Sequence, residues 1–102
     1  MELLTKEIRE AFKKTGSQVG KMEEATCIVK FFDPTGSWTW YATEFDGEDT
    51  FFGLVDGFEL EWGDFSLSEL QSVKGRFGLG IERDRYFGMP KLKDVGRLQG
   101  RL

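Results

Sequence analysis

Residues 37–70 constrain the fold most, because apolar and polar side chains alternate along this stretch in runs that turn residues separate. In the first run, aromatic and β-branched side chains fall on both faces of a strand, with Trp38, Trp40 and Ala42 on one face and Thr39, Tyr41 and Thr43 on the other. A strand without a polar face fits the middle of a sheet. The turn at 46–49, Asp-Gly-Glu-Asp, predicts a hairpin that returns through a second strand at 50–55.

The third run of this stretch is acidic on one side and aromatic on the other. Phe58, Leu60 and Trp62 alternate strictly with Glu59 and Glu61. This pattern predicts an antiparallel strand with a buried aromatic face and an acidic face toward water. The sequence Ser-Leu-Ser-Glu that follows at 66–69 matches a capping box, in which the first serine and the glutamate satisfy free N–H groups at a helix start. A short helix is therefore predicted from residue 67 to about residue 73.

The flanking segments add one more helix and two more strands. Thr5 is a suitable N-cap for an amphipathic helix that ends at Gly16, and apolar side chains at spacings of three and four predict that this helix packs on the sheet. The apolar run at 27–32 predicts the first strand, and residues 81–87 predict the last one. Residues 17–24 have no clear period and are typical of a mobile loop.

Together these elements predict a single α+β domain over residues 1–102. It contains a small antiparallel sheet of four to five strands, an N-terminal helix and a short helix after the acidic strand. The core is expected to span about residues 5–87. Residues 88–102 are basic and poor in apolar side chains, which predicts a loose helix or a disordered tail.

The amino-acid composition indicates how such a domain is stabilised and in which compartment it is expected. With 10 phenylalanines, three tryptophans and two tyrosines, the chain can fill a core without a disulfide. The single cysteine, Cys27, excludes an intrachain disulfide and fits a reducing compartment. No apolar run approaches the roughly 20 residues of a membrane span, and no signal-peptide core follows Met1. We therefore expect a cytoplasmic protein without membrane contact, whose oligomeric state the sequence leaves open.

The net charge of -4 hides a strong asymmetry along the chain. Residues 31–73 contain no lysine or arginine but ten acids, so this segment alone carries a formal charge of -10. The C-terminal third, residues 74–102, carries eight of the 14 basic side chains. This asymmetry is expected to attract basic partners to the acidic segment and anionic partners to the C-terminal third.

Four short motifs stand in a fixed order along the chain. They are Thr-Trp-Tyr-Ala-Thr-Glu-Phe-Asp at 39–46, Phe-Gly-Leu-Val-Asp at 52–56, Phe-Ser-Leu-Ser-Glu-Leu at 65–70 and Glu-Arg-Asp at 82–84. In this order they resemble an uncharacterised bacterial family, domain of unknown function 2958, over roughly residues 28–87. The resemblance implies a small single-domain protein of a kind often carried on plasmids, integrative elements or phages. It implies no known activity.

Most metal-dependent and nucleophilic chemistries are excluded by counting side chains. The chain has no histidine and one cysteine, so it holds neither a tetrahedral zinc site nor a Cys–His pair. Cys27 itself is expected in the core. The turn at 46–49 lacks the ligand spacing of an EF-hand, and the acidic segment has no lysine to complete a two-metal nuclease. We therefore predict a protein without metal or cofactor, and a metal-dependent hydrolase is the least favoured function.

The acidic segment favours one function over the others: a non-enzymatic binding protein of a mobile element. Its acids would meet a basic protein surface and modulate or inhibit a nucleic-acid enzyme by imitating DNA. The candidate partner-binding residues are the acids of the central strands and turns: Glu44, Asp46, Glu48, Asp49, Asp56, Glu59, Glu61 and Asp64. The alternative is an accessory nucleic-acid-binding domain that uses Arg76, Arg83 and Arg85 in the basic C-terminal third.

Overall fold

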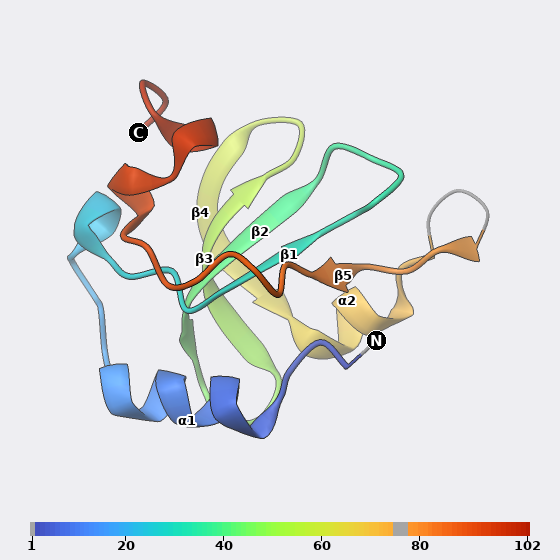
Figure 1. Cartoon of the computed structure of the whole chain (residues 1–102), viewed down its shortest axis with the longest axis horizontal. Helices are drawn as coiled ribbons and strands as arrows, with labels where there is room; N and C mark the ends of the chain where they lie inside the picture. Colours follow the sequence, from blue (N-terminus) through green and yellow to red (C-terminus); the bar gives the residue numbers. More distant parts are fainter. Residues whose placement is uncertain (1, 75–77) are drawn as a thin grey trace.

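The computed structural model describes residues 2–74 and 78–102 and contains one antiparallel sheet (Figure 1). Its strands are β1 (Val29–Phe32), β2 (Thr39–Phe45), β3 (Thr50–Asp56), β4 (Leu60–Ser66) and β5 (Glu82–Arg83). The five strands lie in the order β4-β3-β2-β1-β5, so β4 and β5 are the edges. The helices are α1 (Lys6–Thr15), α2 (Leu67–Ser72) and the short 3-10 helices η1 (Met22–Glu24), η3 (Leu92–Asp94) and η4 (Gly96–Leu98). This arrangement confirms the predicted α+β class, including the N-terminal helix and the short helix after β4.

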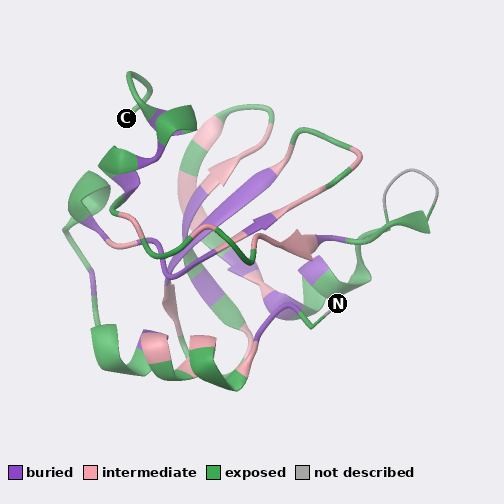
Figure 2. Cartoon of the chain, in the orientation of Figure 1, coloured by how far each residue is buried: buried purple, intermediate pink, exposed green. Residues whose placement is uncertain are grey.

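Each face of the sheet has its own hydrophobic core. We call the side of α1 and α2 the first face and the side of η3 and η4 the second face. Trp40 and Ala42 of β2 pack on the first face, and Tyr41 packs on the second, as the alternation in the sequence predicts. Figure 2 shows the buried residues concentrated along the central strands between these two layers. A strand with two apolar faces is therefore central because both of its faces are covered.

Phe51 of β3 is the centre of the first-face core. It is fully buried, and its ring centroid lies 4.6 Å from that of Phe45, 5.4 Å from those of Phe31 and Phe65, and 5.9 Å from that of Phe12. These rings come from β1, β2, β4 and α1, so one side chain contacts three strands and the helix. Aromatic pairs at such separations add to the stabilisation from burial alone.

Both helices begin at residues that the sequence predicts. Thr5 Oγ1 accepts a hydrogen bond from Ile8 N–H at 3.2 Å at the start of α1, and Gly16, with φ of +70°, ends it in a conformation that glycine adopts without strain. At the start of α2, Ser66 Oγ accepts from Glu69 N–H at 3.0 Å. The caps therefore fix where each helix enters the first-face layer.

The C-terminal segment is packed on the second face, which corrects the expectation of a loose tail at 88–102 and of a core that ends near residue 87. Leu92 and Leu98 are fully buried, and Val95 is buried as well. Their spacing of three residues places them on one side of two successive 3-10 turns, in which residues i and i+3 eclipse each other. Three apolar side chains are therefore enough to seat the segment on the sheet.

Backbone hydrogen bonds to residues 25–27 also hold the C-terminal segment in place. Cys27 N–H donates to Pro90 O at 2.8 Å, and Leu92 N–H donates to Ala25 O at 2.9 Å, so two stretches far apart in the sequence lie antiparallel. The strand predicted at 27–32 begins only at Val29. This pairing contributes to the difference, because the N–H of Cys27 bonds to the C-terminal segment and not to a neighbouring strand.

Two further expectations are wrong. Phe58 is 94% exposed, because it lies in the turn before β4 and not on the buried side of the strand. The last strand, predicted over 81–87, covers only Glu82–Arg83. It ends there because Asp84 Oδ1 accepts from Tyr86 N–H at 3.0 Å, which turns the chain away from β1.

Gln18 anchors the loop that the sequence predicts to be mobile. Its side-chain Nε2 donates to the carbonyl oxygens of Thr26 and Thr43, both at 2.8 Å, and its Oε1 accepts from Thr26 N–H at 2.7 Å. Gln18 is buried, so these bonds replace water contacts that the backbone has lost. The loop is thereby tied to β2.

Replacing Gln18 with alanine is expected to lower the free energy of unfolding by about 2–3 kcal/mol, because the N–H of Thr26 and the carbonyl oxygens of Thr26 and Thr43 lose their partners. Urea denaturation followed by tryptophan fluorescence measures the loss. The matched control is Gln71→Ala on the exposed side of α2, which is expected to change stability by less than about 0.5 kcal/mol. Equal effects of the two substitutions would contradict the anchoring role.

Candidate functional site

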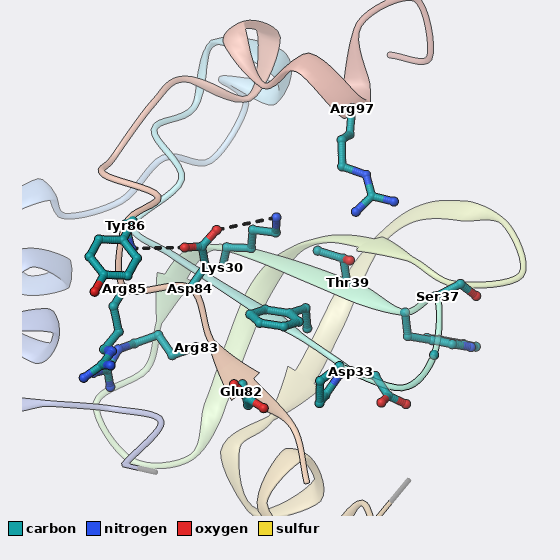
Figure 3. A pocket seen from close by; sticks show the side chains of 14 residues that line it. Lys30, Asp33, Ser37, Thr39, Glu82, Arg83, Asp84, Arg85, Tyr86 and Arg97 are labelled. Carbon is teal, nitrogen blue, oxygen red and sulfur yellow. Dashed lines mark hydrogen bonds and ion pairs between the residues drawn. The ribbon is translucent and has the colours of Figure 1, made fainter. Parts of the chain in front are cut away.

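A cavity of about 550 Å³ opens between the β1–β2 hairpin, residues 82–86 and η4 (Figure 3). Its volume lies in the range of small-molecule sites. The lining combines charged, hydroxyl-bearing and aromatic side chains: Lys30, Phe32, Asp33, Ser37, Thr39, Glu82, Asp84 and Arg97. This mixture makes the cavity a candidate ligand site.

Strand register arranges the floor of the cavity. Phe32 pairs with Glu82 of β5 and with Thr39 of β2. Directly paired residues of antiparallel strands project from the same face, so these three side chains form a row across three strands on the second face. Arg97 reaches over the Thr39 end of this row, while Glu82 lies at the other end (Figure 3).

Lys30 and Asp84 form one wall as an ion pair. Lys30 Nζ lies 3.7 Å from Asp84 Oδ2, and the lysine side chain is only 14% exposed. Asp84 Oδ1 also accepts from Tyr86 N–H, and Lys30 Nζ lies 5.3 Å from the ring centroid of Phe87. The two opposite charges therefore compensate each other within the wall.

The two ends of the cavity carry opposite charges that no direct partner compensates, although the charge of Arg97 also acts on the carboxylate of Asp56. Among residues 2–74 and 78–102, neither the guanidinium of Arg97 nor the carboxylate of Glu82 has a hydrogen-bond or ion-pair partner. Asp33 lies at the same end as Glu82 in Figure 3, and its Oδ1 accepts from Thr35 N–H at 2.9 Å and from Thr35 Oγ1–H at 3.0 Å. On the second face the cavity is therefore dipolar, with a cationic end at Arg97 and an anionic end at Glu82 and Asp33, while Arg83 and Arg85 line it with side chains that point away from Arg97 (Figure 3).

Two arginines of the nucleic-acid alternative, Arg83 and Arg85, also line this cavity. Arg83 Nη1 donates to the carbonyl oxygen of Glu2, and the side chains of Arg83 and Arg85 point away from Arg97 (Figure 3). Arg83 pairs with Phe31, which places its side chain on the first face. Arg76 lies outside the described residues. Arg83 and Arg85 are thus brought near each other, but not onto the face that carries Arg97.

Two of the candidate partner-binding acids build local structure. Asp46 Oδ1 accepts from the N–H groups of Glu48, Asp49 and Thr50 at 2.8, 3.0 and 3.1 Å. These backbone hydrogen bonds, that of Glu48 first, hold the pKa of Asp46 below its usual range. Asp49 accepts from Ser68 N–H at 2.9 Å and from its hydroxyl at 2.7 Å, and so ties the β2–β3 turn to α2.

Asp56 is a third acid with a structural role. Arg101 donates to its two carboxylate oxygens at 2.9 and 3.0 Å, a bidentate pair that fastens the end of the chain to β3. The Asp56 side chain is 15% exposed. The hydrogen bond from Arg101 holds the pKa of Asp56 below its usual range. Asp56 is therefore occupied within the chain and not free for a partner.

Asp56→Asn is expected to remove part of the acid sensitivity of the fold. The folded-state pKa of Asp56 lies below the unfolded value of about 3.8, so its contribution is complete above about pH 4 and is lost as the pH falls through the folded-state pKa. Free energies of unfolding measured in urea between about pH 2.5 and pH 7 should fall less steeply below about pH 4 in the variant. A Glu59→Gln control is expected to keep the native slope, and identical slopes in all three proteins would contradict this role.

Glu44 and Asp64 lie beside Phe52, an exposed aromatic residue that is stacked on the half-buried Trp62. Both acids pair with Phe52 across the sheet, so the three side chains form a row on one face. The Phe52 ring is stacked on Trp62, with centroids 6.2 Å apart and an interplanar angle of 13°. Phe52 is 38% exposed although it is a large apolar side chain in a strand.

The aromatic pair belongs to a larger uncovered surface, because η3 and η4 cover only part of the second face. Val19 and Met22, both exposed, line a shallow hollow of about 390 Å³ together with Phe52 and Trp62. We call these four residues the open patch. The open patch was not among the sequence predictions, although Phe51 and Phe52 are adjacent in a strand and therefore cannot both enter the first-face core.

The eight candidate acids do not form a single face. Glu61 pairs with Val55, so its side chain projects on the first face, opposite to Trp62. Glu59 and Glu61 are exposed along the β4 edge, and Glu48 is exposed in the β2–β3 turn. The predicted alternation of β4 is confirmed from Leu60 to Trp62, but it separates these acids from Glu44 and Asp64.

Cys27 and Tyr41, two side chains with nucleophilic groups, both lie in the second-face core. Within residues 2–74 and 78–102, no three His, Cys, Asp or Glu side chains converge as a metal site. Cys27 is fully buried, burial raises the pKa of its thiol far above the ordinary value, and its Sγ donates to Val29 O at 3.3 Å. The hydroxyl of Tyr41 is buried without a partner in the described chain, and burial raises its pKa as well. These side chains are core residues rather than nucleophiles.

None of the described helices has the length and apolarity needed to cross a lipid bilayer.

Comparison with known proteins identifies a family but no individual relative. No curated protein and no solved structure matches the chain. The family model DUF2958 matches residues 3–93, a range that extends beyond both ends of the segment that carries the four sequence motifs. The chain therefore belongs to the DUF2958 family, which is described as a family of proteins of unknown function.

Proposed function

We propose that the chain is a non-enzymatic binding protein whose open patch, with Glu44 and Asp64 beside it, engages a basic protein partner. The observation that supports this most is the position of two carboxylates on either side of the exposed Phe52, whose ring is stacked on the half-buried Trp62. Neither carboxylate has an ion-pair partner in residues 2–74 and 78–102. Aromatic side chains inside a polar rim are typical of protein interfaces.

This arrangement also describes the partner. An apolar side chain of the partner would cover the Phe52–Trp62 pair, and lysine or arginine side chains around it would meet the two carboxylates. Nucleic-acid enzymes have basic clefts of this kind, so the chain would modulate or inhibit such an enzyme of a host cell or of a mobile element, in the cytoplasm. The proposal differs from the sequence prediction in its residues, because it relies on the acids of the second face.

Paired charge reversals test the proposal. The variant Glu44→Lys/Asp64→Lys is expected to bind a captured basic partner at least tenfold more weakly, because two attractive contacts become repulsive. Glu59→Lys/Glu61→Lys carries the same change in net charge on the other side of β4 and serves as the matched control. Affinity capture with the native chain, followed by calorimetry of each variant with the captured partner, gives the comparison. Equal weakening by both variants would contradict a role for the open patch.

The nucleic-acid alternative is an outcome of a second measurement. Fluorescence anisotropy of labelled DNA and RNA at about 50 and 200 mM salt covers the range in which phosphate contacts are revealed. We expect no binding, because Arg83 and Arg85 share their segment with Glu82 and Asp84. Micromolar binding that disappears at the higher salt concentration would favour the basic C-terminal third over the open patch.

A further inference from the structure

We infer that the cavity on the second face binds a small zwitterion of about dipeptide size, with its carboxylate at Arg97 and its ammonium group at Glu82. This inference concerns a site separate from the open patch and does not depend on the proposed function. It rests on the two uncompensated charges at opposite ends of the cavity and on the aromatic floor between them.

The cationic end suits a carboxylate. The planar guanidinium of Arg97 can donate two parallel hydrogen bonds to the two oxygens of a carboxylate. Figure 3 places Ser37 and Thr39 on the side of the cavity toward which Arg97 points, and both line the same cavity. Their hydroxyl groups have no partner within the described chain and can donate to the same carboxylate.

The length of the floor sets the size of the ligand. Glu82 and Thr39 are separated by two steps between neighbouring strands, which is roughly 10 Å from backbone to backbone. The two charges of a free α-amino acid lie on groups bonded to one carbon, so they do not reach both ends. A dipeptide separates its charges by one peptide unit, and its apolar side chains would lie on Phe32.

The same charges disfavour ligands of a single sign. A ligand with only negative groups would meet the carboxylates of Glu82 and Asp33 at one end, because the side chains of Arg83 and Arg85, which also line the cavity, point away from Arg97 (Figure 3). A ligand with only positive groups would meet Arg97 at the other end. Lys30 and Asp84 favour neither sign, because they are paired with each other in the wall. Of the three ligand types, only the zwitterion satisfies both ends at once.

Titration of leucyl-leucine into 15N-labelled protein tests this inference, with chemical-shift changes at the cavity residues giving the dissociation constant. N-acetyl-leucyl-leucine lacks the ammonium group, and leucyl-leucine amide lacks the carboxylate. The dipeptide is expected to bind about tenfold more tightly than either blocked form, because each block removes a charge-assisted hydrogen bond. Free leucine is expected to bind more weakly than the dipeptide. Equal affinities, or no shift changes at about 10 mM dipeptide, would overturn the inference.

Two single substitutions assign the ends of the ligand. Arg97→Gln is expected to bind the dipeptide about tenfold more weakly and to lose the distinction between it and its amide, whereas Glu82→Gln should lose the distinction from the N-acetyl form. Arg9→Gln and Glu10→Gln on α1, on the first face, are matched controls with unchanged binding. Neither Arg97 nor Glu82 has a side-chain partner among the described residues, so both variants should keep the native melting temperature. Native ligand preferences in both cavity variants would refute the assignment.

Discussion

Replacing Gly53 with alanine is expected to lower the free energy of unfolding by about 3 kcal/mol or more, which is a large part of the total stability of a small domain. Gly53 lies in the middle of β3, opposite Ala42 of β2. A Cβ atom added there would overlap the carbonyl oxygen of Tyr41 and lie 3.0 Å from Cα of Ala42. Both atoms belong to the backbone, so relief of the overlap requires β2 and β3 to separate.

The neighbouring strand offers a matched control. Gly63 of β4 is the other cross-strand partner of Gly53, and a Cβ atom at Gly63 would meet no heavy atom within 4 Å. Gly63→Ala is therefore expected to change stability by less than about 1 kcal/mol. Urea denaturation of the two variants gives the comparison, and similar losses would show that crowding at β2 is not the cause.

Ending the chain after Phe87 is expected to abolish cooperative folding. The deletion removes three apolar side chains of the second-face core, Leu92, Val95 and Leu98, and exposes Tyr41. Removal of one large buried aliphatic side chain typically costs about 2–5 kcal/mol, so the combined loss approaches the total stability of a small domain. Near-ultraviolet circular dichroism and thermal denaturation of the shortened chain are the measurements.

A shorter deletion separates packing from the terminal ion pair. A chain that ends after Gln99 lacks residues 100–102 but keeps the three buried side chains. Of the removed residues, Arg101 forms the ion pair, and its side chain is 44% exposed. Its expected loss of stability is about 1 kcal/mol. A cooperative transition in the chain that ends after Phe87 would mean that the first-face core alone supports the fold.

Local sequence patterns predicted the elements whose structure depends on near neighbours. The alternation around Trp40 located a central strand because both of its faces are buried. The capping residues Thr5 and Ser66 located both helix starts, because their hydroxyl groups bond N–H groups only three residues away. The class of the fold followed from the order of these elements.

Features that depend on distant pairing were not predictable in the same way. Residues 88–102 are poor in apolar side chains, and their three buried ones become informative only when the second face is known to need a cover. The cavity is likewise lined by residues of β1, β2, β5 and η4, and no local sequence pattern predicts that Arg97 lies near Thr39. Among the candidate acids, sequence alone did not separate Asp46, Asp49 and Asp56, which bond within the chain, from those that remain free.

The seating of the last segment on the second face also has a consequence for synthesis of the chain. Residues 90–98 emerge from the ribosome after every strand of the sheet, yet they bury Tyr41 and Leu54 and bond to the backbone at Ala25 and Cys27. During translation the first face can therefore assemble against α1, while the second face stays in contact with water until residues 90–98 have left the ribosome. In this interval the nascent chain exposes an apolar sheet surface. This surface must be shielded from other chains or covered quickly by residues 90–98.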